Sequence, residues 1–368
     1  MEDKWRHWIA KCLTKGHSDA YIEQYLLTKG LPKEEVITEL ASAKSHPYIK
    51  GASEVYQRDV GGAPSPFQGS SDDMFYLDKA LNNQAWVLSS YEKLARLDPD
   101  FGKIQRINAP PLSTFVSRYI SANRPVIIQG AMENWIPKKK WSFDYFRAVH
   151  ADAIVGIQDG RDTDPDYEKN QKFLRSEVRF DAFLDRLEAT ASSNDFYMTA
   201  GNMGSHRDAL YSLFEDAESV DIRGEYFDFP AQGSLWIGPK GTITPLHFDM
   251  INNFFCQIIG RKRIRLVPSW SLPWVYNEYH VYSEVDVKNV DFGSFPEFAK
   301  ATVYDFVIEP GEVLFIPLGW WHHLESLDHS VSLTRKNLKV SSKDAYGDGF
   351  VRESRLFKPR SSESIPSE

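Results

Sequence analysis

Apolar side chains recur at helical spacing in the first part of the chain. One face of an expected first helix carries Trp5, Trp8, Ile9 and Cys12. A second helix is expected between the capping residue Ser18 and Gly30, and a third begins at Pro32. We predict a small helical module over residues 1–56 that is too short to bury its apolar face well by itself. It could recruit a partner or form the interface of a homodimer.

The pattern then changes several times along the chain. Residues 57–72 are rich in Gly, Pro and Ser, which predicts a linker, and residues 73–103 predict a bridging amphipathic helix. Helices and strands alternate at the start of a second predicted domain over residues 104–337, and strands dominate from Asp195 to Thr334. This order indicates a mainly β barrel or sandwich with helical additions. The polar tail over residues 338–368 is expected to be disordered.

Composition narrows the class of protein. The chain has 368 residues, of which 42% are hydrophobic and 14% aromatic, so a large packed core is expected. A net charge of −8 gives no general attraction to nucleic acid or to anionic lipid, so nucleic acid is an unlikely partner. No apolar run approaches the roughly 20 residues of a membrane span, and the first residues lack a signal-peptide core. Two cysteines, Cys12 and Cys256, fit a reducing compartment, so a cytoplasmic location is expected.

A candidate metal site begins at His247-Phe248-Asp249. If this segment is a strand, His247 and Asp249 point to the same face. One further histidine, His322 or His323, would complete the set of two imidazoles and one carboxylate that non-heme Fe(II) oxygenases use. The two neighbours face opposite ways on a strand, and we prefer His322. An isolated His-x-Asp is a weak signal, because it occurs by chance in many chains.

A lysine on the next strand pair strengthens the signal. In the predicted strand 261–267, Lys262 shares a face with Ile264 and Leu266 and so points inward. A buried ammonium needs an anionic partner, because desolvation alone costs several kcal/mol. A bound carboxylate would supply that partner. The arginines on the other face, Arg261, Arg263 and Arg265, are expected to be solvated.

Four motifs together resemble the JmjC, cupin-like hydroxylases, and within them the asparaginyl hydroxylases of the hypoxia response. They are Thr244-Pro245-Leu246-His247-Phe248-Asp249, Asn253-Phe254-Phe255, Gly260-Arg261-Lys262-Arg263 and residues 317–326. The resemblance covers about residues 104–337. It implies a double-stranded β-helix, or jelly roll, that uses Fe(II), 2-oxoglutarate as cosubstrate and O₂.

The resemblance also implies a role for individual residues. His247, Asp249 and His322 match the iron ligands, and His322 falls five residues after the turn proline Pro317. The positions that match contacts to 2-oxoglutarate or its surroundings are Lys262, Thr244, Tyr197 and Asn253. Thr334 takes the polar place at the end of the last strand. Arg335 and Lys336 then stand where the family usually has two aromatic residues.

The sequence leaves several functions open. The resemblance favours hydroxylation of a side chain in a protein or peptide. A hydroxylase of a tRNA base or small metabolite is an alternative, as are a non-catalytic metal-binding cupin and a Zn or Mn cupin isomerase. We expect Trp236, Phe248, Phe255 and Trp321 to line the cavity or pack in the core. The acidic segment 215–221 is expected to be a solvated loop that could also attract a basic target.

Overall fold

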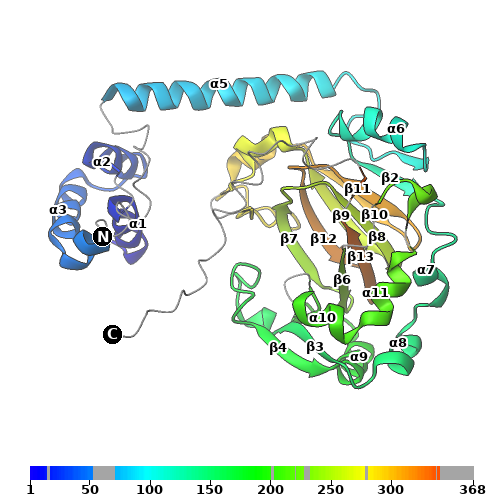
Figure 1. Cartoon of the computed structure of the whole chain (residues 1–368). Coiled ribbons are helices and arrows are strands. Elements are labelled where there is room, and N and C mark those ends of the chain that lie inside the picture. The colour runs from blue at the N-terminus through cyan, green and yellow to red at the C-terminus, as the bar shows by residue number, and fades with distance from the viewer. Residues whose placement is uncertain are drawn as a thin grey trace, which may run out of the picture. The chain divides into compact units, whose positions relative to one another are not determined.

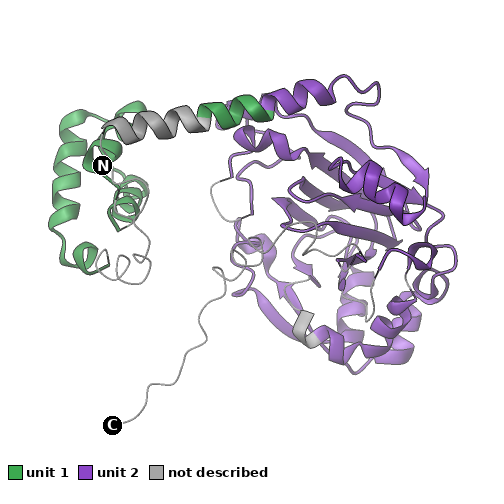
Figure 2. Cartoon of the chain, turned by 45° about the horizontal axis from the view of Figure 1, so that its top comes forward, with its two compact units in different colours: residues 1–88 green, residues 89–368 purple. Residues whose placement is uncertain are grey.

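The computed structural model divides the chain into two compact units, residues 1–88 and residues 89–368 (Figure 2). It describes residues 1–14, 17–52, 71–199, 203–219, 221–227, 233–277, 281–336 and 338–339. The predicted linker lies almost wholly outside the described residues, as does nearly all of the predicted tail. The finer domain boundaries expected from the sequence stay predictions.

The N-terminal unit contains the three short helices expected from the sequence (Figure 1). They are α1 (Asp3–Thr14), α2 (Asp19–Thr28) and α3 (Lys33–Ser45). Ser18 caps α2 by accepting a hydrogen bond from the backbone N–H of Tyr21 at 3.3 Å. The three helices bury a core of their own, in which Ile9, Ile22 and Val36 are fully buried. The expectation that this module buries its apolar face poorly is therefore wrong, because three helices enclose a common centre.

The long helix α5 (Ser71–Ala95) contains residues of both units. Its last turns belong to the second unit, where the hydroxyl of Thr302 donates a hydrogen bond to Glu92 at 3.1 Å. The second unit then begins with short elements: β1 (Arg106–Asn108), α6 (Leu112–Phe115), the π-helical turn η1 (Val116–Ile120) and β2 (Val126–Gln129). The second unit thus opens with a helical segment after Pro111 and a buried strand after Arg124, so helices and strands do share its start.

Two sheets face each other in the second unit and form the jelly-roll sandwich; all their strand pairs are antiparallel except β1 with β2 (Figure 1). The larger sheet has the order β1-β2-β11-β8-β13-β6, and the smaller has the order β10-β9-β12-β7. Their further strands are β6 (Gly233–Gly238), β7 (Ile243–Phe248), β8 (Asn253–Ile259), β9 (Lys262–Val267), β10 (Tyr304–Ile308), β11 (Val313–Ile316), β12 (Trp321–Ser326) and β13 (Ser330–Arg335). The mainly β fold with helical additions is confirmed.

A third, smaller sheet and several helices lie beside the sandwich. The sheet has the order β4-β3-β5, with β3 (Ile154–Asp159), β4 (Arg175–Arg179) and β5 (Phe196–Tyr197). The helices are α7 (Ile136–Lys140), α8 (Phe143–His150), α9 (Phe180–Ala189), α10 (Met203–Ala209) and α11 (Tyr211–Glu218). Short 3₁₀ turns complete the set: η2 (Arg161–Thr163), η4 (Ile222–Gly224), η5 (Ser269–Trp274) and η6 (Pro296–Lys300).

Strand alternation separates the core into three layers. In β8, Phe254 and Cys256 face the helical side, while Phe255 points between the two sheets. In β9, Ile264 and Leu266 join Phe255 in that inter-sheet layer, whereas Val267 faces the outer side of the small sheet. Any polar residue in register with the inter-sheet residues must therefore be satisfied inside the sandwich.

One prediction in this region is wrong. The acidic segment 215–221 is not a solvated loop, because it begins within α11. Asp216 accepts hydrogen bonds from Trp141 Nε1 at 3.2 Å and from the Tyr145 hydroxyl at 3.1 Å. Asp221 accepts from the backbone N–H of Tyr226 at 2.8 Å. Asp216 thus fastens α11 to α7 and α8, and Asp221 supports the turn before Tyr226, whereas Glu215 and Glu218 are exposed. Among the described residues, no helix is both long and apolar enough to cross a bilayer.

The aromatic cluster between the large sheet and the helices yields a stability prediction. Phe315 is fully buried, with its ring 5.0 Å from Phe115 and 5.1 Å from Phe254. Phe315→Ala should lower the free energy of unfolding by about 3–5 kcal/mol, because the cavity cannot be refilled. Urea unfolding followed by near-UV circular dichroism measures this. Phe173→Ala, at a side chain that is 75% exposed, is the control and should change stability by less than about 0.5 kcal/mol. Equal effects would contradict this packing.

Candidate metal and cosubstrate site

A bulge in β7 brings two polar residues to the same side of the small sheet. His247 pairs with His322 across β7 and β12, but Thr244 pairs with Leu324, so β7 carries one extra residue between them. Pro245, which has no N–H to donate, lies within this irregular stretch. Thr244 and His247 therefore line one cavity although their sequence separation is odd.

The three predicted metal ligands meet at this place. Ligand atoms of His247, Asp249 and His322 all lie within 4.8 Å of one another. The imidazole rings of the two histidines are 4.1 Å apart, and Nε2 of His322 is 3.9 Å from Oδ2 of Asp249. Two neighbouring strands of the small sheet position them: His247 lies in β7, Asp249 directly follows β7, and His322 lies in β12.

Hydrogen bonds prepare the histidines for a metal. Nδ1 of His247 lies 2.8 Å from the carbonyl of Pro245, and Nδ1 of His322 lies 3.0 Å from the carbonyl of Trp320. A carbonyl can only accept, so each Nδ1 donates and each Nε2 keeps its lone pair for a ligand bond. Burial and repulsion from His247 lower the pKa of His322, which keeps that ring neutral.

The carboxylate is held in its charged form. Burial alone would raise the pKa of Asp249, but attraction to His322, Lys336 and His247 outweighs it, so the pKa of Asp249 is lowered overall. Asn253 contributes to this by donating a hydrogen bond from Nδ2 to Oδ2 of Asp249 at 2.8 Å. Asn253 therefore orients the candidate metal ligand, and its own buried Oδ1 has no hydrogen-bond partner among the described residues.

A lysine and a tyrosine form the candidate cosubstrate anchor. Lys262 is 2% exposed, and its Nζ donates a hydrogen bond to the Tyr197 hydroxyl at 3.0 Å. No carboxylate among the described residues pairs with this ammonium. Burial, and then repulsion from Arg161, lowers the pKa of Lys262 to about 7. Burial raises the pKa of Tyr197, so the phenol stays protonated and can donate to an anion.

A cavity of about 350 Å³ connects these groups. Seven of the eight residues expected from the sequence line it: Tyr197, Thr244, His247, Asp249, Asn253, His322 and Thr334. Lys262 does not line the cavity itself but lies behind Tyr197 and Phe255, with Nζ 5.4 Å from the centre of each ring. The Thr334 hydroxyl accepts a hydrogen bond from Trp236 Nε1 at 3.4 Å.

The cavity wall differs from the expected one in two aromatic positions. Trp236 and Phe255 line it, but Phe248 and Trp321 do not. Those two rings pack on each other at 4.9 Å in the outer layer of the small sheet. This orientation follows from strand alternation: Phe248 is next to His247 and Trp321 is next to His322, so both rings point away from the cavity that the histidines line.

Two arginines also differ from expectation. Arg265 is only 6% exposed, so it is not solvated like Arg261 and Arg263; Asp305 and Glu325 pair with it at 3.4 and 3.3 Å. Arg335 is fully buried, and its guanidinium lies 4.7 Å from the centre of the Phe227 ring and donates to the carbonyl of Ala217. Arg335 thus replaces an aromatic residue within the helical side of the core, and β13 still pairs with β6 and β8 up to this residue.

Sequence reasoning missed several residues of the cavity. Thr199 lines it with a buried hydroxyl that has no hydrogen-bond partner among the described residues. Glu168, Gln171 and Tyr282 also line it, from segments that lie far from the four motifs. No local pattern marks these positions, although Thr199 lies two residues after Tyr197. Lys336 lines the cavity at an exposed position.

This donor set fits Fe(II) and a dicarboxylate. Two imidazoles and one carboxylate suit a divalent transition metal and leave room for further ligands. The buried ammonium without a carboxylate, beside a phenol that can donate, suits the far end of 2-oxoglutarate. The hydroxyl of Thr199 and the amide oxygen of Asn253, which have no hydrogen-bond partner among the described residues, add further polar groups to the cavity.

Comparison with known proteins agrees with this fold and site. The cupin-like domain model matches residues 111–336. A lysine-specific demethylase 8 from Danio rerio is 34% identical over 242 residues, which cover 63% of this chain and 57% of that protein. The Xenopus tropicalis protein of the same name is 31% identical over 240 residues, covering 63% and 52%. Human HSPB1-associated protein 1 is 31% identical over 232 residues, covering 57% and 46%.

The chain belongs to the cupin-like domain family, because the family model spans more than half of its length. The resemblance to JmjC, cupin-like proteins is confirmed. A particular likeness to asparaginyl hydroxylases stays a prediction. The matched region spans about half the length of these relatives.

Metal binding should depend on the inward histidine and not on its neighbour. We expect His322→Ala and Asp249→Ala to weaken Mn²⁺ binding by about a hundredfold or more, because each removes one of three ligands. Calorimetric titration of the metal-free protein with Mn²⁺ measures this. The matched control is His323→Gln, on the opposite face of β12, which should bind Mn²⁺ like the wild type. Loss of binding in His323→Gln with retention in His322→Ala would contradict the assignment.

Proposed function

We propose that this chain is an Fe(II)- and 2-oxoglutarate-dependent oxygenase that hydroxylates a side chain of a protein or peptide. The observation that carries the proposal is the pairing of two features in one site. The candidate ligands His247, Asp249 and His322 converge in the cavity. Behind its wall lies Lys262, a buried ammonium that only an anion can satisfy.

Each protein group has a defined part in this proposal. Iron, when bound with 2-oxoglutarate and O₂, supplies the oxidising chemistry, and the protein binds, orients and excludes water. His247, Asp249 and His322 hold the metal, and Asn253 fixes the carboxylate of Asp249. Lys262 and the hydroxyls of Tyr197 and Thr244 bind the distal carboxylate. Trp236 and Phe255 keep water from the reacting centre.

The competing functions fit the site less well. An isomerase of the cupin type has no use for the buried ammonium of Lys262. A non-catalytic cupin was suggested only by Arg335 and Lys336, and Arg335 lies in the core away from the cavity. The net charge of −8 disfavours a tRNA substrate. The relatives from Danio rerio and Xenopus tropicalis are both named lysine-specific demethylase 8. Removal of an N-methyl group begins with the same hydroxylation, so product mass separates the two outcomes.

The protein or peptide substrate, the homodimer and the cytoplasmic location stay proposals. A search for the substrate would incubate the enzyme with a cell lysate and its cosubstrates. Peptides that gain one oxygen support hydroxylation, and peptides that lose a methyl group support demethylation.

Turnover without substrate tests the oxygenase directly. Protein with Fe(II), ascorbate and 2-oxoglutarate should release succinate slowly, and His247→Ala or Asp249→Ala should abolish this release. Lys262→Ala should raise the 2-oxoglutarate concentration for half-maximal release by about a hundredfold, because it removes one partner of a buried charge pair. Arg263→Ala, which removes a charge from the exposed face of the same strand, is the matched control. Equal succinate release by wild type and Asp249→Ala would refute the proposal.

Cosubstrate binding should be linked to proton uptake at alkaline pH. The pKa of Lys262 is lowered to about 7 in the free protein, so above that pH the amine is mostly neutral. A bound dicarboxylate favours the ammonium, so binding takes up a proton at about pH 8.5 and none at about pH 6. Calorimetry in buffers of different ionisation enthalpy counts these protons. In Lys262→Arg, which stays charged, the uptake should disappear. Binding at pH 8.5 without proton uptake in the wild type would contradict the role of Lys262.

A further inference from the structure

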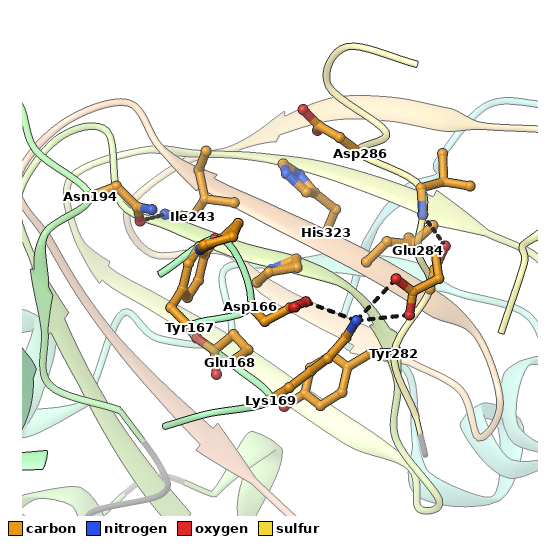
Figure 3. A pocket seen from close by; sticks show the side chains of 15 residues that line it. Asp166, Tyr167, Glu168, Lys169, Asn194, Ile243, Tyr282, Glu284, Asp286 and His323 are labelled. Atoms are coloured by element: carbon orange, nitrogen blue, oxygen red, sulfur yellow. Dashed lines mark hydrogen bonds and ion pairs between the residues drawn. The ribbon is translucent and has the colours of Figure 1, made fainter. Parts of the chain in front are cut away.

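A second cavity, of about 320 Å³, lies on the other side of β7 and β12 from the metal ligands (Figure 3). Residues 165–169 and residues 282–286 form two of its walls. Glu168 and Tyr282 line both this cavity and the catalytic cavity, so the two adjoin. Tyr282 also forms an antiparallel bridge with His247. The two cavities are therefore neighbours that share part of a wall.

The walls of the second cavity are acidic. Four carboxylates line it, against a single ammonium: Asp166, Glu168, Glu284 and Asp286 face Lys169. Nζ of Lys169 lies 2.8 and 3.0 Å from the two oxygens of Glu284 and 2.9 Å from Asp166 (Figure 3). Arg161 pairs with Glu168 at 3.0 Å. Asp286 has no ion-pair partner among the described residues, so the cavity keeps an excess of negative charge.

His323 adds a buried donor to these walls. The residue is 2% exposed and lines the cavity. Its Nδ1 lies 3.3 Å from Nη1 of Arg265, and a guanidinium can only donate, so Nδ1 accepts. The hydrogen of the neutral ring is therefore on Nε2. This Nε2 is buried and has no hydrogen-bond partner in the part of the chain that the structure describes.

The two features together select one class of ligand. A bare metal ion would be attracted to the carboxylates but would be repelled by the Nε2–H donor of His323. An anion could accept from that donor but would be repelled by the carboxylates. A lysyl or arginyl residue within a peptide satisfies both, because its side chain is cationic and its backbone carbonyl accepts a hydrogen bond. A simple amine lacks the acceptor.

We propose that this cavity is a subsite for a lysyl or arginyl residue of the peptide substrate, at a position that flanks the residue being oxidised. His323 donates to a backbone carbonyl of the substrate, and Glu284 and Asp286 attract its cationic side chain. This inference rests on the proposed function for its peptide substrate, but the subsite binds peptide without any reaction. It defines the substrate class as basic peptides.

Peptide binding in the absence of metal and cosubstrate tests the subsite. The probes are two blocked tripeptides, acetyl-Gly-Lys-Gly-amide and its norleucine counterpart, titrated against the full chain with ligand-detected NMR. We expect the lysyl peptide to bind at least about fivefold more tightly than the norleucyl peptide at low salt, with the difference shrinking at high salt. The double variant Glu284→Gln with Asp286→Asn should reduce the preference to less than about twofold.

Two comparisons keep this test independent of folding and of catalysis. Glu297→Gln, which removes the same kind of charge from an exposed pair with Lys300, should leave the preference intact. The wild-type comparison needs no variant at all. Equal affinity for the two peptides, binding of neither at millimolar concentration, or an undiminished preference in the double variant would each overturn the subsite. Uncoupled succinate release is scored separately, so a failed subsite and a failed oxygenase give different results.

Discussion

The constraint on which the site depends is the burial of the Lys262 ammonium. The residue lies in register with the inter-sheet layer, where Ile264 and Leu266 follow it at alternate positions of β9. Its Nζ donates a hydrogen bond to the Tyr197 hydroxyl, and burial lowers its pKa to about 7. A charge held in this way destabilises the free protein and is stabilised by an anionic ligand. The binding of a carboxylate close to the candidate metal ligands would therefore offset the cost of burying the Lys262 ammonium.

Alternation along β7 and β12 then determines which side of the small sheet each of their side chains faces. The β7 bulge turns Thr244 and His247 to one side, and His322 faces the same side from β12. The neighbours of the candidate ligands necessarily face the other way. Trp321 packs in the outer layer, and His323 lines the acidic cavity there. Two adjacent histidines thus line two cavities: His322 belongs to the candidate metal site, and His323 belongs to the proposed peptide subsite.

The sequence predicted the helical module and the mainly β domain, because helical spacing and strand alternation act locally. Seven of the eight candidate site residues line one cavity, and Lys262 lies behind two of the rings in its wall. The sequence-based predictions failed where contacts between distant segments determine whether a side chain is buried. Arg265 shares a face with two solvated arginines, yet Asp305 and Glu325 from other strands bury it. Asp216 reads as part of an acidic loop, yet it receives hydrogen bonds from Trp141 and Tyr145. Thr199, Glu168 and Tyr282 reach the cavity from segments without a recognisable pattern, so no local signal could place them there.

A crystal structure grown without oxygen, with Mn²⁺ and 2-oxoglutarate, tests the central claim most directly. The account predicts metal bound by His247, Asp249 and His322, and one carboxylate of the ligand against Lys262 and Tyr197. It would be contradicted by metal at another place, or by a bound dicarboxylate whose far end leaves the Lys262 ammonium without an anionic partner.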